Sequence, residues 1–160
     1  PFYHYGLENF LKKAEEIGVS GTVIPDLPYE MSQKYEPIFK KYNKSNITFV
    51  APTTPKDRIK TLVENSSKFI YMVAYAGITG SGREEDLSQI IENIREYSQT
   101  PLYIGFGIDE KTCKEKSKNL DGVIVGSAFV KHLLDDSLNN NEKIKKISSI
   151  AKEIKQKINE

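Results

Sequence analysis

Residues 102–108 are Leu-Tyr-Ile-Gly-Phe-Gly-Ile, and residues 122–128 are Gly-Val-Ile-Val-Gly-Ser-Ala. Each segment is an apolar, β-prone run that ends in glycine. Continuous hydrophobic runs of this kind are typical of parallel strands covered on both faces. Glycine lets the main chain come close to an anion. The pair of glycine-containing ends, Gly105-Phe106-Gly107 and Gly126-Ser127, therefore predicts a phosphate site where two strands end.

Three more runs of this kind lie upstream, and segments with helical spacing separate the runs. The runs are residues 21–25, 47–51, 69–73, 102–105 and 122–126, and the helical segments are residues 7–17, 31–42, 59–63 and 87–94. This alternation has the spacing of βαβ crossovers. It predicts one α/β domain over residues 1–160, either an open doubly wound sheet or a (β/α)8 barrel. Pro37 should kink or restart the second helix.

The loops after the strands separate these two architectures. Many (β/α)8 barrels bind phosphate in the loops after their last two strands, which favours the barrel. On its own, Gly105-Phe106-Gly107 is equally compatible with a tight turn. It is not a dinucleotide-binding fingerprint, because the third glycine of that motif is missing. The glycine-rich loop at residues 74–82 is either a lid over the site or a surface connection.

The composition excludes several classes of function. The 160 residues are 38% hydrophobic and 28% charged, with 23 Lys and Arg against 22 Asp and Glu, a net charge of +1. This balance argues against a nucleic-acid partner or an anionic membrane, and no apolar run is long enough to span a bilayer. The single cysteine, Cys113, indicates a reducing compartment, so we expect a cytoplasmic protein. A chain that begins at Pro1 is expected to be processed or incomplete.

The last segment, residues 142–160, places isoleucines on one face and lysines elsewhere. This pattern is typical of a closing amphipathic helix laid on a core. A helix that binds a membrane surface or a partner helix has the same pattern, so that alternative stays open.

Motifs at all five strand ends occur in the order and spacing of one known family. They are Pro25-Asp26-Leu27-Pro28-Tyr29-Glu30, Val50-Ala51-Pro52-Thr53-Thr54, Phe69-Ile70-Tyr71 leading into Gly77-Ile78-Thr79-Gly80, Gly105-Phe106-Gly107-Ile108, and Asp121-Gly122-Val123-Ile124-Val125-Gly126-Ser127-Ala128. Over its whole length the chain resembles the α subunit of tryptophan synthase. The resemblance implies a partial TIM barrel that supplies strands four to eight of the family's (β/α)8 fold.

The resemblance implies a lyase of tryptophan biosynthesis that cleaves indole-3-glycerol phosphate to indole and glyceraldehyde 3-phosphate. Such a retro-aldol reaction needs an acid to protonate the indole carbon and a base to remove a hydroxyl proton. In the family a Glu and a supporting Asp serve the catalysis, and both positions fall before Pro1. We therefore name no principal acid or base, and we expect these 160 residues alone to be inactive.

The other half of the family's site matches residues that are present. By resemblance, Tyr71 is the active-site tyrosine that supports the catalytic Glu, although a half-buried core aromatic would look the same in sequence. Thr79 and Gly80 match the lid, and the remaining matches bind the glycerol phosphate. Those remaining residues are Phe106, Gly107, Gly126 and Ser127.

The resemblance also implies a partner, the tryptophan synthase β subunit, in an α2β2 heterotetramer. Pyridoxal phosphate would belong to that partner, and this chain would hold no cofactor of its own. The implied interface residues are Asp26, Leu27, Pro28, Tyr29, Pro52, Thr53, Thr54 and Gly77. Asp26 is equally well explained as a turn-former before Leu27-Pro28.

Isolated residues with reactive side chains predict little. His4 and His132 have no metal-ligating neighbours at suitable spacing, so no metal site is expected. Cys113 has no positioned base in the sequence and is expected to be a packing residue. Two other functions stay open: another phosphate-binding barrel, such as a sugar-phosphate isomerase or a thiamine-phosphate synthase relative, and a catalytically silent module that binds phosphate or the partner.

Overall fold

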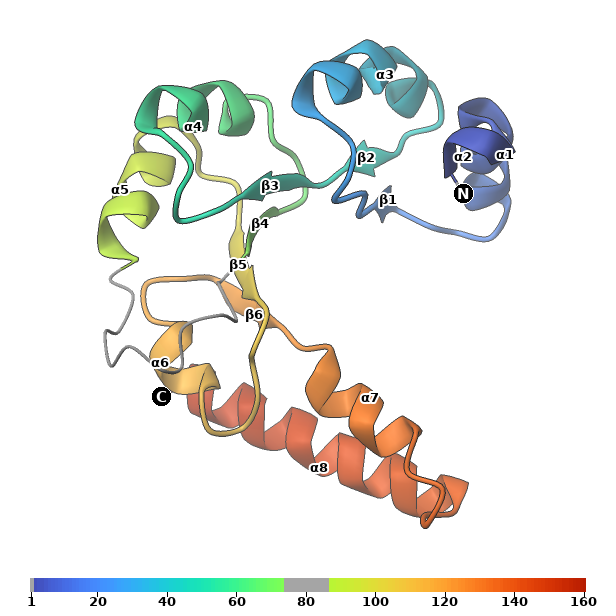
Figure 1. The fold of residues 1–160 in the computed structure, drawn as a ribbon, viewed down its shortest axis with the longest axis vertical. Helices are drawn as coiled ribbons and strands as arrows, with labels where there is room; N and C mark the ends of the chain where they lie inside the picture. Colours follow the sequence, from blue (N-terminus) through green and yellow to red (C-terminus); the bar gives the residue numbers. More distant parts are fainter. Residues whose placement is uncertain (1, 74–86) are drawn as a thin grey trace.

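The computed structural model describes residues 2–73 and 87–160, and its strands are all parallel. β1 (Gly21–Thr22) pairs with β2 (Ser45–Asn46), and a four-stranded sheet has the order β3-β4-β5-β6. The strands of that sheet are β3 (Thr48–Val50), β4 (Ile70–Val73), β5 (Leu102–Gly105) and β6 (Gly122–Ile124). Figure 1 shows the strands in chain order through the middle of the molecule.

One residue, Ile47, separates β2 from β3. Its N–H donates to the carbonyl of Thr22 on β1 at 2.9 Å, so pairing continues across the gap between the two sheets. β2 and β3 therefore act as one strand position. Each of the five apolar runs contains one strand, namely β1, β3, β4, β5 or β6, whereas β2 lies just before the second run. The α/β class with parallel strands is confirmed.

Helices follow the strands as the spacing predicts, and Figure 1 shows α4 and α5 side by side above the level of α6 to α8. The bounds are α1 (Phe2–Tyr5), α2 (Leu7–Glu16), α3 (Tyr29–Lys41), α4 (Lys56–Val63), α5 (Ser88–Tyr97), α6 (Cys113–Lys116), α7 (Ser127–Leu133) and α8 (Asn140–Ile158). α8 begins two residues before the expected position 142. The reason is a capping box, in which Glu142 N–H donates to Asn139 Oδ1 and Asn139 N–H donates to a Glu142 carboxylate oxygen.

Of the two effects expected of Pro37, a kink or a restart of the helix, the restart does not occur. α3 continues from Tyr29 to Lys41 through Pro37. A proline inside a helix removes one hydrogen bond, here to the carbonyl of Gln33, but it does not by itself end the helix. Beyond Pro37, Phe39 is buried at 3% exposure, and this packing holds the last turns in place.

The two faces of the β3–β6 sheet differ in chemistry. On one face, aligned aliphatic residues are almost completely buried beneath the helices: Val50, Met72 and Ile104 in one row, and Ile70 and Leu102 in the next. On the other face, Phe49, Tyr71 and Tyr103 form an aligned aromatic row that is only half buried. The sequence predicts strands covered on both faces, whereas the described residues cover only the aliphatic face.

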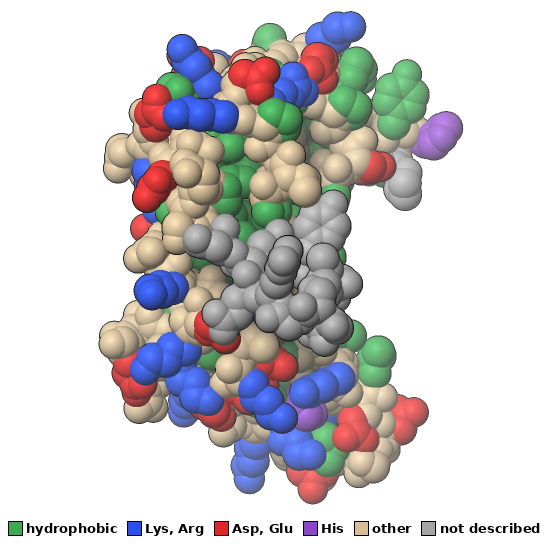
Figure 2. All heavy atoms as spheres, turned by 60° about the vertical axis from the view of Figure 1, so that its left-hand side comes forward, with side chains coloured by type: hydrophobic (Ala, Val, Ile, Leu, Met, Phe, Trp, Pro, Cys, Tyr) green, Lys and Arg blue, Asp and Glu red, His purple; other side chains and the backbone are tan. Residues whose placement is uncertain are grey.

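The outer surface agrees with this division. Figure 2 shows hydrophobic side chains between the elements of the upper part of the molecule, whereas charged side chains gather on the outside of the upper and lower parts. Among the described residues, no helix combines the length and apolar character needed to cross a membrane.

Candidate functional site

The two predicted phosphate turns lie at the same edge of the sheet. β5 and β6 are neighbouring parallel strands, with Gly105 aligned to Ile124. Phe106 and Gly107 follow the end of β5, and Gly126 and Ser127 lie just beyond the end of β6. Carboxyl ends of parallel strands are the usual location of ligand sites in α/β folds. The fold therefore places the four residues on adjacent loops.

The turn after β5 has an unusual backbone. Phe106 has φ 76° and Gly107 has φ 62°, two consecutive residues in the left-handed region. Only glycine adopts this region readily, and a non-glycine residue there is often found at a functional site. The Phe106 side chain is also 53% exposed. An exposed aromatic ring on a left-handed residue is more readily explained by a ligand than by packing.

Side chains from the following helical turn hold the carbonyl of Gly107. Thr112 Oγ1 donates to it at 2.9 Å, and Lys116 Nζ donates to it at 3.1 Å. Asp109 fixes the turn itself, because its Oδ1 accepts from the N–H groups of Lys111 and Thr112 at 2.9 Å each. Burial raises the pKa of Asp109, but these hydrogen bonds outweigh burial and hold the pKa below its ordinary value. The turn is therefore braced by an ionised carboxylate at neutral pH.

Tyr71, the predicted supporting residue, reaches this turn from β4. A Cβ atom added to Gly105 would lie 2.1 Å from the Tyr71 hydroxyl oxygen and 2.5 Å from Cζ. Glycine is therefore required at 105 by the close approach of the tyrosine ring. The Tyr71 ring stacks on Phe49 at 5.0 Å between centroids and meets Phe106 edge-on at 6.5 Å. We call Phe49, Tyr71 and Phe106 the aromatic cluster.

The hydroxyl of Tyr71 is a hydrogen-bond donor at neutral pH. Burial raises the pKa of Tyr71 above the ordinary value of 10.0. The neutral form is thus favoured, and the group can donate a proton in a hydrogen bond to a carboxylate.

The turn after β6 is open. The Gly126 carbonyl accepts from the N–H groups of Phe129 and Val130 at 2.9 and 3.1 Å, which starts α7. Gly126 and Ser127 are exposed, and a Cβ atom at Gly126 would meet no described atom within 4 Å. The contrast with Gly105 is informative. Among the described residues, nothing crowds the main chain at Gly126, so a ligand can approach it.

The two loops predicted to meet a partner lie after β1 and β3. Thr54 closes its loop, because its hydroxyl oxygen accepts from Ala51 N–H at 3.0 Å. Arg58, on α4, contacts the start of α3: its Nη2 lies 2.6 Å from Glu30 Oε1, and its Cζ lies 5.4 Å from the centre of the Tyr29 ring. These contacts join the two helices that follow the predicted interface loops.

Three of the predicted residues lie outside the described part of the chain. They are Gly77, Thr79 and Gly80, within residues 74–86. The structure therefore leaves the predicted lid and the third part of the predicted interface untested.

The sequence reasoning did not identify Thr112, Lys116 or Arg58. Each of them makes a side-chain contact with another loop or turn. For Arg58 and Lys116, no local sequence pattern predicts that contact. Thr112 alone had a usable signal, since Asp109-x-x-Thr112 is typical of a capped turn.

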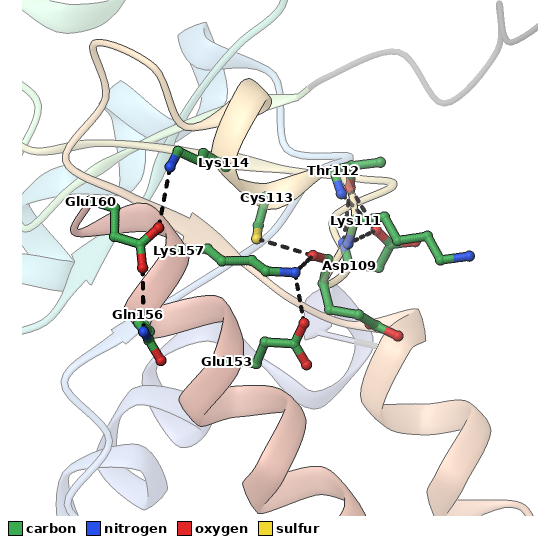
Figure 3. Close-up of polar contacts among 10 residues, drawn as sticks. Asp109, Lys111, Thr112, Cys113, Lys114, Glu153, Gln156, Lys157 and Glu160 are labelled. Atoms are coloured by element: carbon green, nitrogen blue, oxygen red, sulfur yellow. Dashed lines mark hydrogen bonds and ion pairs between the residues drawn. The ribbon is translucent and has the colours of Figure 1, made fainter.

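Two other features lie away from this site. A cavity of about 320 Å³ is lined by residues of α3, α4, β2 and β3, including Phe39, Asn46 and Leu62, but not by the phosphate turns or Tyr71. The second feature is the α6–α8 contact of Figure 3, where Lys157 donates to the Glu110 carbonyl and pairs with Glu153, each at 2.6 Å. Its position between two helices gives it a structural role.

Cys113 lies within that contact and is completely buried, as expected for a packing residue. Its thiol donates to the Glu110 carbonyl at 3.9 Å. In the described ranges, no group of three or more His, Cys, Asp or Glu side chains is arranged to hold a metal ion.

Comparisons with known proteins agree on one family. A family model described as tryptophan synthase alpha chain matches residues 1–159. The tryptophan synthase alpha chain of Wolinella succinogenes is 52% identical over 160 residues, covering 99% of this chain and 63% of that relative. The one from Methanocaldococcus jannaschii is 40% identical over 146 residues, covering 89% of this chain and 52% of that relative.

Solved structures give the same result for the fold. Tryptophan synthase subunit alpha from Campylobacter jejuni superposes with a TM-score of 0.83 at 36% identity, covering 93% of this chain and 60% of that one. The parallel strands and this coverage identify the architecture as a partial (β/α)8 barrel, as predicted. The chain spans about 60% of the length of the relatives it matches. A different phosphate-binding barrel is not favoured by these matches, and the chain belongs to the tryptophan synthase alpha chain family.

Proposed function

We propose that this chain is part of a tryptophan synthase α chain whose complete form cleaves indole-3-glycerol phosphate to indole and glyceraldehyde 3-phosphate. Family membership supports this activity, and one observation in the structure carries it to these residues. The Tyr71 hydroxyl lies against Gly105, immediately before the turn at Phe106 and Gly107. A hydrogen-bond donor and an aromatic cluster therefore meet, at one strand end, the turn that we propose binds the phosphate.

In the proposed reaction the bond between indole C3 and the first glycerol carbon breaks. A base removes the proton from the hydroxyl on that carbon, which becomes the aldehyde, and an acid delivers a proton to C3. By resemblance, the Glu and Asp that do this work belong to the part of the family barrel that precedes these residues. Tyr71 would act as a supporting residue, donating a hydrogen bond to the catalytic carboxylate from its neutral hydroxyl.

The phosphate of the substrate would bind at the carboxyl edge of β5 and β6. We assign its contacts to the main-chain amides around Phe106 and Gly107 and around Gly126 and Ser127. Left-handed backbone at the first turn and unobstructed main chain at the second support this assignment. The aromatic cluster would then face the indole ring, since planar rings favour stacked or edge-on contacts. By resemblance, Thr79 and Gly80 would close over the bound substrate as a lid.

The proposed partner is the tryptophan synthase β subunit, in an α2β2 assembly. The contact surface would comprise the segments Asp26–Tyr29 and Pro52–Thr54 together with Gly77. Arg58 would support this surface through its contacts with Tyr29 and Glu30 at the start of α3. Pyridoxal phosphate would sit on the partner, and the α chain would need no cofactor. A solved structure that shares this fold, at 24% identity and a TM-score of 0.80, is of a tryptophan synthase complex from Pyrococcus furiosus. We place the protein in the cytoplasm.

A direct test compares two proteins: a complete α chain containing these residues, and residues 1–160 alone. Indole release from indole-3-glycerol phosphate is measured for each, with and without β subunit. We expect turnover by the complete chain, faster with the β subunit, and none by residues 1–160. Absence of turnover by the complete chain would refute the proposed activity. Steady turnover by residues 1–160 would refute the assignment of the acid and base to the preceding part.

A further inference from the structure

Lys116 reaches from the end of α6 back to the turn after β5. Its Nζ donates to the Gly107 carbonyl at 3.1 Å, and its side chain is half buried. The resemblance to the family does not single out this lysine. Its position beside the proposed phosphate turn comes from the structure alone.

The ammonium group is close to the amide that would bind phosphate. A Cβ atom added to Gly107 would lie 3.0 Å from Lys116 Nζ. Cβ and N are bonded to the same Cα and are about 2.5 Å apart, so Gly107 N is within about 5.5 Å of the ammonium group. A phosphate oxygen bonded to that amide is then within about 8 Å, about one Debye length at physiological salt. The attraction is therefore only partly screened.

Lys116 also fixes the direction of the peptide group. The Gly107 carbonyl accepts from both Thr112 Oγ1 and Lys116 Nζ. Because the peptide unit is planar and trans, fixing this carbonyl turns the Ile108 N–H to the opposite side. The two side chains thus set which way the donors of the turn point.

The charge of Lys116 is not neutralised by a described neighbour. Lys114, on the same short helix, pairs with Glu160 at 3.2 Å, and Lys157 pairs with Glu153. No ion pair within residues 2–73 and 87–160 includes Lys116. Its positive charge therefore remains available to an anion at the turn.

We propose that Lys116 is a positioning residue for the phosphate site: it orients the Gly107 peptide and adds a positive charge beside the bound phosphate. This inference rests on the proposed function and adds a residue to it. Lys116 strengthens phosphate binding and takes no part in breaking the carbon–carbon bond.

The test uses Lys116→Gln in the complete α chain. The dissociation constant of inorganic phosphate and the KM for indole-3-glycerol phosphate should each rise about 5-fold at low salt, the size expected for one partly screened charge. The kcat should not change. The difference from wild type should shrink as salt is raised, and Lys116→Arg should restore binding.

Two further variants separate charge from peptide orientation. Lys114→Gln removes a lysine from the same helix that does not contact Gly107, and it should bind phosphate as the wild type does. Thr112→Val removes the hydroxyl that contacts both the Gly107 carbonyl and Asp109, but it keeps the charge of Lys116, so its weaker binding should keep the wild-type salt dependence.

The outcomes distinguish this inference from the proposed function. Equal phosphate binding by wild type and Lys116→Gln, or an equal loss in Lys114→Gln, would overturn the role of Lys116 alone. A fall in kcat with an unchanged KM would also overturn it. If the wild type binds no phosphate, both the proposed function and this inference fail.

Discussion

The two faces of the β3–β6 sheet have different roles, one in stability and one in the proposed site. The aliphatic face, with Met72 and Ile104 at 0% exposure, is closed by helices. The aromatic face carries Phe49 and Tyr71, is half buried, and ends at the turn that holds Gly105 and Gly107. Substitutions on the first face should therefore change stability alone, whereas substitutions on the second should change activity more than stability.

The largest expected effect is on the aliphatic face. Leu102→Ala removes a completely buried side chain from the core, which should lower the free energy of unfolding by about 3 kcal/mol. Urea unfolding of the complete chain measures this change. The KM for substrate should stay at the wild-type value, and a large rise in KM would show that the two faces are not independent.

The next effect is on the aromatic face, where Tyr71 lies against Gly105. Gly105→Ala forces the Tyr71 ring out of its position, because the added Cβ overlaps the ring. We expect a loss of about 2 kcal/mol of stability, in the range for overpacking, together with loss of most activity.

A double-mutant cycle checks that cause. In a Tyr71→Ala background the overlap is absent, so Gly105→Ala should cost much less stability there. An equal cost in both backgrounds would mean that the close approach of Tyr71 is not the reason for glycine at 105.

A smaller effect is predicted for the hydroxyl of Tyr71. Tyr71→Phe keeps the ring and its stacking on Phe49, so stability should change by less than about 0.5 kcal/mol. Loss of the donor should lower kcat about 10-fold, within the range for one hydrogen bond to a charged group. Since burial raises the pKa of Tyr71, any loss of wild-type activity through its ionisation should begin at a higher pH than for an ordinary tyrosine. Steady-state kinetics of the two proteins across pH measure both effects.

The smallest effect is predicted for Asp121, which contacts Leu102 at the start of β5, the end opposite the phosphate turn. Asp121 accepts from Leu102 N–H at 2.7 Å and pairs with Arg95. Burial raises the pKa of Asp121, but these hydrogen bonds and the Arg95 charge outweigh it and lower the pKa below the ordinary value of 3.8.

A carboxylate with a lowered pKa in the folded state stabilises the fold above its unfolded pKa, and this stability is lost as pH falls through the folded pKa. Asp121→Asn should therefore be less stable than wild type at pH 6, by about 1 kcal/mol or less, with the gap closing below pH 4. Urea unfolding of both proteins at pH 6 and below pH 4 measures this difference in stability. A difference that is the same at both pH values would contradict the proposed role of the Asp121 carboxylate.

The strands and the turns that follow them were predictable because their signals are local. Apolar runs placed all five strand positions, and glycine marked the turns at 105–107 and 126. Local rules also had limits. Pro37 did not break α3, because packing of Phe39 outweighs one lost hydrogen bond. The capping box at Asn139 moved the start of α8, since a side-chain cap decides where a helix begins.

The contacts that join separate parts of the chain could not be predicted in this way. Arg58 reaches Glu30 across 28 residues, and Lys116 returns to Gly107 past a capped turn. Such pairs depend on how helices come to lie beside one another, which hydrophobic periodicity does not specify.

The central claim is that the turns after β5 and β6 bind one phosphate together. Titrating the complete, 15N-labelled α chain with inorganic phosphate and following backbone amide resonances by NMR tests it directly. We expect the backbone amide resonances of Gly107 and Ser127 to shift with the same dissociation constant for phosphate. If only one of them responds, or if they saturate at different phosphate concentrations, the two turns do not form a single site.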